Sequence, residues 1–533
     1  MNGFWSGQSI RALGAAMLLG AAACAARGQE GPRTPPRPDP KPASPMPVRW
    51  NAGLTVSPTG AVTIAGRAIF SSSTLAVGWE PPGVPVDHYE AQAVDGVAAT
   101  SQTVSAASPG LLLMGLKAGT AYTVTVKACL DRGCSQFLQS PPTTAATSEE
   151  YWQVQGAGSG YATATRVVAD GNVGAHGFRF GAWARPELRG RLQLYYNPLS
   201  GSEKGVKTAV TSGPATDLAS VSRFQGIGGF GLRTPCPATP PGQPPPNCPG
   251  TGLVRNVSLF QAVPMNGFVR LYFEANGTDQ RSRILYLDSQ DGEIGRDFHR
   301  GAETLCQTMA DYAAGGACEP AVAIGVQGDA VAGNEGVQHA RQFKILYPAR
   351  EDGRWDGAPG TAMIFTVNPA NPGCSPYSFT QAYAVWSGSR WQVQYQPNGC
   401  PKLFEQMQAP NPVHLGGARY KLYFNNNPIL RGQSNDPLSN LKPMKLLYAD
   451  GARTGDPAVV DFEDWEPAGA ARELHYLWPD GTLLDLDSES KFDDHVTILP
   501  TGDPGFQVIY ANMSGGQNSQ APPFVGMAVL LNP

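Results

Sequence analysis

The sequence is poor in charge, and its charges nearly cancel. Charged residues make up 15% of the 533 residues, and the formal net charge at pH 7 is −4. Nucleic acids and anionic membrane surfaces are bound by clustered Lys and Arg, so we expect neither as a partner. Long apolar runs are also scarce. The run from Ala12 to Ala23 is too short to cross a hydrocarbon layer about 30 Å thick.

Common catalytic and cofactor motifs are missing as well. The sequence has no P-loop, no G-x-S-x-G, no H-E-x-x-H and no C-x-x-C, and its seven histidines are scattered without metal-ligand spacing. We therefore expect no cofactor. The acidic runs at 461–466 and 485–490 offer oxygen ligands for Ca²⁺, and a solvated loop is the alternative for both.

The N-terminus has the pattern of an export signal. Arg11 precedes the apolar run, which predicts a signal peptide over residues 1–23. The sequence AAAC that ends at Cys24 resembles the lipobox of bacterial lipoproteins, which implies that Cys24 is lipidated and that the membrane is contacted only through this anchor. By the same resemblance, Ala25 directs the protein to the outer membrane or cell surface. Ordinary cleavage after Ala23 or Ala25, giving a secreted or periplasmic protein, is the alternative.

The nine cysteines support an oxidising compartment. Eight of them fall along the chain as four close neighbours, and short loops close at the least entropic cost. Cys24 is then the one left over. The expected disulfides are Cys129 with Cys134, Cys236 with Cys248, Cys306 with Cys318, and Cys374 with Cys400.

Two N-terminal segments follow the signal. Residues 24–48 form a linker with eight prolines between 31 and 48, which keeps it extended. Residues 49–148 show short alternating strands broken by Pro and Gly, as in a β-sandwich. With Trp79 on an early strand and Leu116 and Tyr122 around a tyrosine corner, this stretch resembles a fibronectin type III domain. The resemblance implies a spacer without chemistry.

A phrase that ends in aromatic residues recurs through residues 151–533. We interpret this stretch as an all-β domain with five blades, a β-propeller; two unrelated β-sandwiches are the alternative. A second strand follows each copy after a loop. The copies are LQLYYN at 192, VRLYFEAN at 269, FKILYPA at 343, YKLYFNN at 420 and FQVIYAN at 506.

The phrases APNPVHLGGARYKLYF and RILYLDSQDG resemble those of the five-bladed arabinanase, xylosidase and invertase glycosidases. The resemblance implies a polysaccharide partner and a central pocket with two carboxyl groups. Glu335, in NEGVQHARQFKILY, matches the family's acid. Asp170 is the candidate base, although it lies upstream of the expected position.

Other pocket positions depart from the family pattern. His176 stands in the first blade without a carboxylate, and Asn256 and Asn411 stand where the family has Asp. Asn cannot accept a proton from water. By the same alignment Asp494 faces the pocket, where we expect a capping or hydrogen-bonding role. Two functions remain open: a glycoside hydrolase with Glu335 as acid, and a surface module that binds glycan or protein without catalysis.

Overall fold

The computed structural model describes most of the chain from residue 48 onward. The predicted leader, Cys24 and the linker up to residue 47 lie outside the described residues, and among those described no helix is both long and apolar enough to cross a bilayer. The described ranges are 48–169, 173–180, 190–198, 205–231, 256–265, 267–277, 279–289, 298–300, 304–306, 320–329, 335–346, 355–416, 419–426, 430, 444–450, 460–484, 490–500, 506–515 and 524–533.

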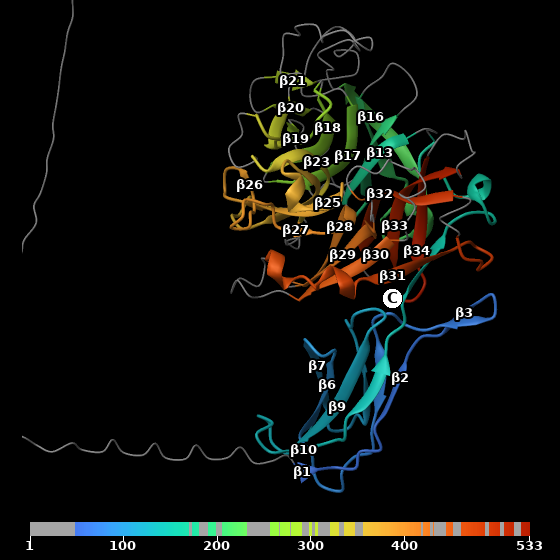
Figure 1. The fold of residues 1–533 in the computed structure, drawn as a ribbon. Helices are drawn as coiled ribbons and strands as arrows, with labels where there is room; N and C mark the ends of the chain where they lie inside the picture. Colours follow the sequence, from blue (N-terminus) through green and yellow to red (C-terminus); the bar gives the residue numbers. More distant parts are fainter. Residues whose placement is uncertain are drawn as a thin grey trace, which may run out of the picture. The chain divides into compact units, whose positions relative to one another are not determined.

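The first module is a β-sandwich (Figure 1). One sheet has the order β1-β10-β9-β6-β7, with β11 also paired to β9; a second has the order β2-β5-β8, and β3 and β4 form a hairpin. The strands are β1 (Val48–Arg49), β2 (Thr55–Pro58), β3 (Val62–Ile64), β4 (Arg67–Ile69), β5 (Leu75–Gly78), β6 (His88–Val94), β7 (Ala99–Ser105), β8 (Gly110–Leu113), β9 (Ala121–Cys129), β10 (Phe137–Gln139) and β11 (Thr143–Ala146).

The core of this sandwich contains the residues that carried the resemblance. Trp79 packs against Tyr89 with ring centroids 4.9 Å apart, and Leu116 is buried in the same cluster. The backbone N–H of Lys117 donates to the Tyr122 hydroxyl at 2.6 Å, which is the hydrogen bond of a tyrosine corner. The predicted fibronectin type III fold is confirmed.

The rest of the chain forms five blades whose successive strands pair antiparallel. Blade one is β13 (Val173–Phe180), β14 (Leu192–Pro198), β15 (Gly205–Thr211) and β16 (Phe224–Gly231). Blade two is β17 (Asn256–Pro264), β18 (Val269–Asn276), β19 (Ser282–Ser289), β20 (Phe298–Arg300) and β21 (Thr304–Cys306), with β22 (Ala321–Ile324) also paired to β19. Blade three is β23 (Val337–Leu346), β24 (Ala362–Pro369), β25 (Thr380–Trp386) and β26 (Trp391–Val393), with β27 (Leu403–Phe404) on β25.

Blades four and five are joined by the strand that follows the sandwich. Blade four is β28 (Met407–Gly416), β29 (Arg419–Asn426), β30 (Met444–Asp450) and β31 (Arg472–Leu477); blade five is β32 (Ser490–Pro500), β33 (Gln507–Gly515) and β34 (Phe524–Leu530). Strand β12 (Glu150–Val154) pairs antiparallel with β34 and parallel with β31. Helical segments are short: α1 (Leu218–Val221) and 3₁₀ turns at Tyr161–Thr163, Pro372–Cys374, Phe462–Asp464 and Ala468–Ala470.

The five blades close into a ring. Their first strands contact one another in the order β13, β17, β23, β28, β32 and back to β13. Five clusters of buried apolar side chains lie between successive blades, including one between blade five and blade one. The all-β propeller is therefore confirmed by topology and by packing.

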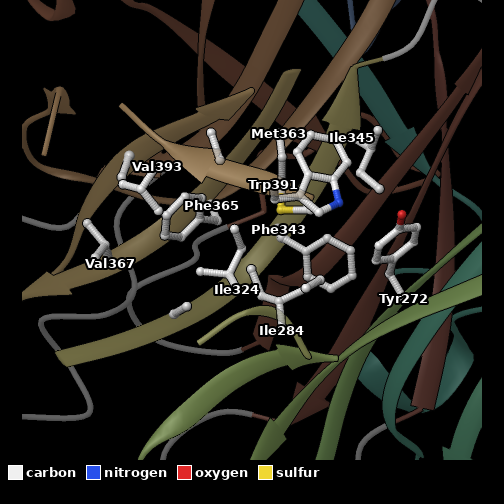
Figure 2. Packing of buried hydrophobic residues seen from close by; sticks show 14 of the residues in the cluster. Tyr272, Ile284, Ile324, Phe343, Ile345, Met363, Phe365, Val367, Trp391 and Val393 are labelled. Carbon is white, nitrogen blue, oxygen red and sulfur yellow. The ribbon is translucent and has the colours of Figure 1, made fainter. Parts of the chain in front are cut away.

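Aromatic pairs recur because neighbouring side chains of a strand point to opposite faces. In β14, Tyr195 packs in the cluster shared with blade two, and Tyr196 packs in the cluster shared with blade five. In β18, Tyr272 and Phe273 divide in the same way between blades three and one. One aromatic pair thus supplies two interfaces. Figure 2 shows the cluster between blades two and three, where Phe343 lies among Tyr272, Ile284, Ile324 and Phe365.

The third copy of the repeat is out of phase with the others. The other four copies are the second strands β14, β18, β29 and β33, but Phe343 and Ile345 of FKILY belong to β23, the first strand of blade three. The second strand of that blade is AMIFTVNP, β24. FKIL in β23 and AMIFTV in β24 are both buried stretches, and such stretches do not reveal the position of their strand in a blade.

Two predicted disulfides are confirmed: Cys129–Cys134 and Cys374–Cys400. Cys236, Cys248 and Cys318 lie outside the described residues, and of the Cys306 region the structure gives strand β21 alone.

Candidate functional site

The candidate site lies at one end of the ring. In an antiparallel blade, the first and third strands start where the second strand ends. We call the end of the ring at which the first and third strands begin the start end. It gathers the turn before β23, the loop before β25 and the loop after β26. Together they place Glu335, Tyr377, Phe379 and Tyr395 around the start of blade three, a group that we call the blade-three rim.

Glu335 is exposed in the turn that leads into β23. The next residue, Gly336, donates its backbone N–H to the Tyr395 hydroxyl at 3.3 Å. A Cβ at position 336 would stand 2.5 Å from the Tyr395 ring, so this close approach requires glycine. Burial raises the pKa of Tyr395, and the negative charge of Glu335 raises it further. The Glu-Gly phrase thus fixes a carboxylate beside a tyrosine.

The other rim aromatics come from the loop before β25. Tyr377 and Phe379 are both half-buried. Gln406, just before β28, donates its side-chain N–H to the Tyr377 hydroxyl at 2.5 Å. The Arg341 guanidinium lies 5.6 Å from the centre of the Phe379 ring. Aromatic faces with a cation and a carboxylate beside them present both apolar and hydrogen-bonding surface to a ligand.

A disulfide braces this rim. Cys374 lies in the loop that carries Tyr377, and Cys400 follows the loop that carries Tyr395. The bond therefore ties together the two loops that supply the aromatic side chains. A covalent brace restricts loop motion and so reduces the entropy that ligand binding must remove.

The first strands also carry irregularities that sequence analysis missed. Pairing shifts at a β-bulge in β17, β23 and β28, where Leu259, Gln342 and Ala409 adopt φ of 34°, 41° and 53°. Non-glycine residues rarely adopt such values, and bulges re-aim neighbouring side chains. No glycine marks these positions, so the sequence offered no signal.

Polar side chains hold the bulges from the preceding blade. Glu274 accepts a hydrogen bond from the Gln342 backbone N–H at 3.0 Å. Thr366 accepts one from the Ala409 N–H at 3.2 Å, and the Gln342 side-chain oxygen accepts from the same N–H at 3.1 Å. Buried Glu274 thus has a structural role in joining blade two to blade three.

Asn411 is buried on β28 opposite Tyr423. Its Nδ2 donates to the Ala409 carbonyl at 3.0 Å. Its Oδ1 has no hydrogen-bond partner among the described residues. An amide held in this way cannot act as a general base, so the position where the family has Asp does not supply one here.

The remaining predicted pocket residues are placed by strand and register. Asp170 lies outside the described residues. His176 is on β13 opposite Tyr196, and Asn256 opens β17 opposite Asn276. Asp494 is on β32 and pairs with Asn512, the last residue of FQVIYAN in β33.

The pairing register shows that these residues lie at different positions along the first strands of their blades, which we call levels. The second-strand residues at the position of Asn512 are Asn197 in blade one, Glu274 in blade two and Asn425 in blade four. They pair with Ala175, Ser258 and Gln408, respectively. His176, Asn256 and Asn411 therefore do not share the level of Asp494. Similar sequence phrases do not fix register when bulges intervene.

Carboxylates of the acidic run at 461–466 are engaged in hydrogen bonds and ion pairs within the protein. Asp461 and Asp464 form a capping box on the short turn that Asp461 precedes and Asp464 ends. Glu466 accepts a hydrogen bond from Lys117 Nζ at 3.0 Å and bonds Arg472. Its second oxygen accepts from the Tyr448 N–H. These carboxylates are engaged by backbone and cations, and the run at 485–489 lies outside the described residues.

Sequence analysis also missed how the sandwich is attached. Lys117 is 5% exposed, and its Nζ lies 2.8 Å from Asp95, 2.6 Å from Asp450 and 3.0 Å from Glu466. Asp95 belongs to the sandwich, whereas Asp450 and Glu466 belong to blade four. Burial lowers the pKa of Lys117, but the hydrogen bonds that its ammonium donates to the acidic groups outweigh this and the net shift is upward.

Neutral hydrogen bonds extend this contact. The Ala118 N–H donates to the Tyr448 hydroxyl at 2.8 Å, and Arg472 donates to the Thr120 hydroxyl at 3.0 Å. Two clefts of about 200 and 250 Å³ flank the contact, and Gly115 and Arg419 line both. Arg419 starts β29, so the sandwich sits at the end of the ring opposite to the blade-three rim.

Comparison with known proteins gives one family match and several structural likenesses. The fibronectin type III domain model matches residues 62–145. No curated protein matches the chain. A thermostable family-43 glycoside hydrolase is similar at 9% identity and TM-score 0.38, covering 68% of this chain and 90% of its own. A Penicillium chrysogenum α-L-arabinanase complexed with arabinobiose is similar at 11% identity and TM-score 0.33, over 67% and 93%.

The sandwich has its own structural likeness. The fn3 domain of the human collagen α-1(XX) chain is similar at 22% identity and TM-score 0.16, covering 20% of this chain and 92% of that one. The hydrogen bond at Tyr122, the two-sheet topology and the family match agree. Residues 62–145 are a fibronectin type III domain, and the chain continues from it into a five-bladed β-propeller.

Proposed function

We propose that the propeller binds a polysaccharide at the blade-three rim. The observation that carries this proposal is the placing of exposed Glu335 beside Tyr395, with half-buried Tyr377 and Phe379 from the neighbouring loop. Sugar rings present apolar C–H faces and hydroxyl edges, which suit aromatic faces and a carboxylate. The disulfide brace supports a preformed surface.

Hydrolysis is the second candidate function, and one observation favours it. Asp494 is on the first strand of blade five, and Glu335 precedes the first strand of blade three. Blade four separates these blades in the ring, so the two carboxylates come from non-adjacent blades that share the axis. A glycosidase needs two carboxyl groups on either side of the scissile bond. In this scheme Glu335 is the acid, and either Asp494 or Asp170 is the base.

The test is binding and hydrolysis by the purified chain on a panel of plant and microbial polysaccharides. Tyr395→Ala and Phe379→Ala should each weaken binding about tenfold or more, because truncating an aromatic anchor at a binding surface typically costs about 2 kcal/mol, and each 1.4 kcal/mol is about tenfold in affinity. Phe137→Ala is the matched control, since Phe137 is a half-buried aromatic on the sandwich. Unchanged binding in both rim variants would refute the proposal.

Glu335→Gln separates the two candidate functions. A hydrolase should lose release of reducing ends in this variant while it still binds polysaccharide. A binding module should release none even as wild type. Activity that survives Glu335→Gln would remove Glu335 from the mechanism.

We also propose that the chain is exported and anchored through Cys24. The two disulfides support export, because such bonds persist in oxidising compartments. Cys24→Ser should release the protein from the membrane fraction into the soluble fraction. Membrane association that persists in this variant would contradict the anchor.

A further inference from the structure

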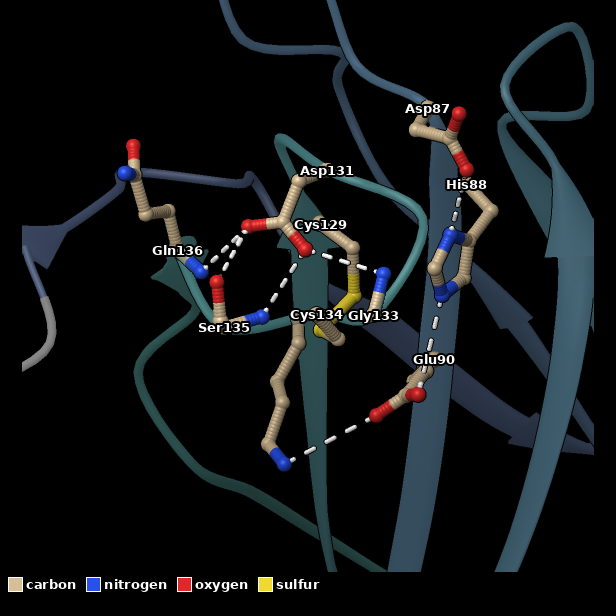
Figure 3. Close-up of a disulfide and its surroundings, with 10 residues drawn as sticks. Asp87, His88, Glu90, Cys129, Asp131, Gly133, Cys134, Ser135 and Gln136 are labelled. Atoms are coloured by element: carbon tan, nitrogen blue, oxygen red, sulfur yellow. Dashed lines mark hydrogen bonds and ion pairs between the residues drawn. A yellow bond between two sulfur atoms is a disulfide. The ribbon is translucent and has the colours of Figure 1, made fainter.

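A group of metal-ligand side chains lies on the fibronectin domain, far from the blade-three rim in sequence. Strands β6 and β9 pair antiparallel with His88 opposite Cys129. His88 and Glu90 are two residues apart and share a face, because Tyr89 between them is buried on the other side. Cys134 returns from the turn after β9 to meet Cys129. Figure 3 shows the four side chains together.

The ligand atoms of these residues are already close. One nitrogen of His88, one oxygen of Glu90 and the two sulfur atoms all lie within 4.8 Å of one another. Two thiolates, an imidazole and a carboxylate are ligands that Zn²⁺ accepts in tetrahedral sites, at about 2.0–2.3 Å from the metal. The spacing therefore needs only small movements to surround one ion.

His88 is oriented as a metal ligand requires. Its Nδ1 lies 2.9 Å from Asp87 Oδ1, and its Nε2 faces Glu90 Oε1 at 3.6 Å. A carboxylate on one ring nitrogen fixes the ring and directs the other nitrogen to the metal. Glu90 is in turn 3.7 Å from Lys127 Nζ, which offsets the negative charge of a site with two thiolates and a carboxylate.

The turn that carries Cys134 is held by more than its disulfide. Asp131 accepts hydrogen bonds from the Gly133 N–H at 2.9 Å, the Ser135 N–H at 3.0 Å and the Gln136 N–H at 2.8 Å. It also accepts one from the Ser135 hydroxyl at 2.7 Å. These bonds, drawn in Figure 3, hold the backbone on both sides of Cys134 and do not involve its sulfur atom.

We propose that Cys129, Cys134, His88 and Glu90 form a redox-controlled site for a zinc-class divalent cation. In the oxidised protein the two sulfur atoms are bonded to each other, and the site is closed. A dithiol reductant transfers two electrons and two protons to this bond, giving two thiols and the reductant's own disulfide. Binding of the cation then displaces both thiol protons to solvent. Metal occupancy would thus depend on the redox state around the protein.

The test uses Co²⁺ as the probe with the full chain, because thiolate ligands give cobalt a charge-transfer absorption. Reduced wild type should bind one Co²⁺ with this band, and oxidised wild type should show none. Cys129→Ser with Cys134→Ser should lose the band. Cys374→Ser with Cys400→Ser should keep it, which excludes the other confirmed disulfide as the source.

Variants of His88 and of its partner Asp87 keep the proposal testable if the double serine variant fails to fold. His88→Gln should weaken Co²⁺ binding by tenfold or more, and Asp87→Asn by about 10- to 100-fold, the usual effect of removing an outer partner of a ligand. The proposal fails if reduced wild type shows no more thiolate–cobalt absorption than the double serine variant. It also fails if His88→Gln binds as tightly as wild type.

Discussion

At the scale of single residues, the propeller buries a charged pair that links two parts of the chain. Glu150 is fully buried on β12, and its carboxylate accepts from Lys421 Nζ at 2.7 Å on β29. The same carboxylate accepts from the Tyr423 hydroxyl at 3.0 Å and from the Trp152 indole at 3.1 Å. Burial lowers the pKa of Lys421, but the charge of Glu150 outweighs this and raises it overall.

Glu150→Gln should lower the free energy of unfolding by about 3–5 kcal/mol, because it leaves the Lys421 ammonium buried without its counter-charge. Urea denaturation of wild type and variant measures the loss. Lys421→Met in the Glu150→Gln background should recover much of it, since the uncompensated charge is then gone. Strictly additive effects of the two substitutions would contradict a coupled pair.

At the scale of strands, sequence patterns identified the strands but did not place every strand at its correct position within a blade. Period-two alternation with an aromatic pair identified β14, β18 and β29, where one strand buries a ring on each face. The same alternation identified β33, which buries Ile509 on one face and Tyr510 on the other. The same pattern misplaced FKILY, since Phe343 and Ile345 are as buried in a first strand as they would be in a second. Local hydrophobicity reports burial and does not report order within a blade.

The candidate site was predictable to a limited extent for a related reason. Glu335 and Gly336 form a local Glu-Gly phrase that the sequence itself shows. The close contact of Gly336 with Tyr395 explains why glycine follows the glutamate. Tyr377 and Phe379 join it through loops whose approach depends on the folded blade. The bulges at Leu259 and Ala409 use residues that carry no turn signal, so register on the first strands required the structure.

At the scale of the whole molecule, the fibronectin domain is attached by buried charges and hydrogen bonds rather than placed as a loose spacer. Asp450 and Glu466 are each more than 300 residues from Lys117 in the sequence, so no local pattern could reveal the contact. One ammonium surrounded by three carboxylates at 5% exposure is held in a low-dielectric setting. The two domains should therefore unfold as one cooperative unit.

The contact also predicts an acid limit. Burial raises the pKa of Glu466 and of Asp95, but hydrogen bonds from Arg472 to Glu466, and from the Ala98 N–H and Lys117 to Asp95, outweigh it and lower both overall. A carboxyl group with a lowered folded pKa contributes stability above its unfolded pKa, and this stability is lost as pH falls through the folded value. The domain contact should weaken below about pH 4, near the ordinary pKa of these groups.

Lys117→Met tests the contact directly. Removal of the ammonium leaves three carboxylates close together, so we expect a loss of about 3–5 kcal/mol in unfolding free energy and a separate early transition of the fibronectin domain. Lys445→Met is the matched control, because Lys445 pairs with half-exposed Glu473 at 3.6 Å and such pairs contribute at most about 1 kcal/mol. Urea denaturation followed separately by fluorescence and by proteolysis of the fibronectin domain distinguishes the two outcomes. A single transition in Lys117→Met, with the midpoint of Lys445→Met, would show that the domains are held together by other contacts, because the buried charge cluster would then carry no net coupling.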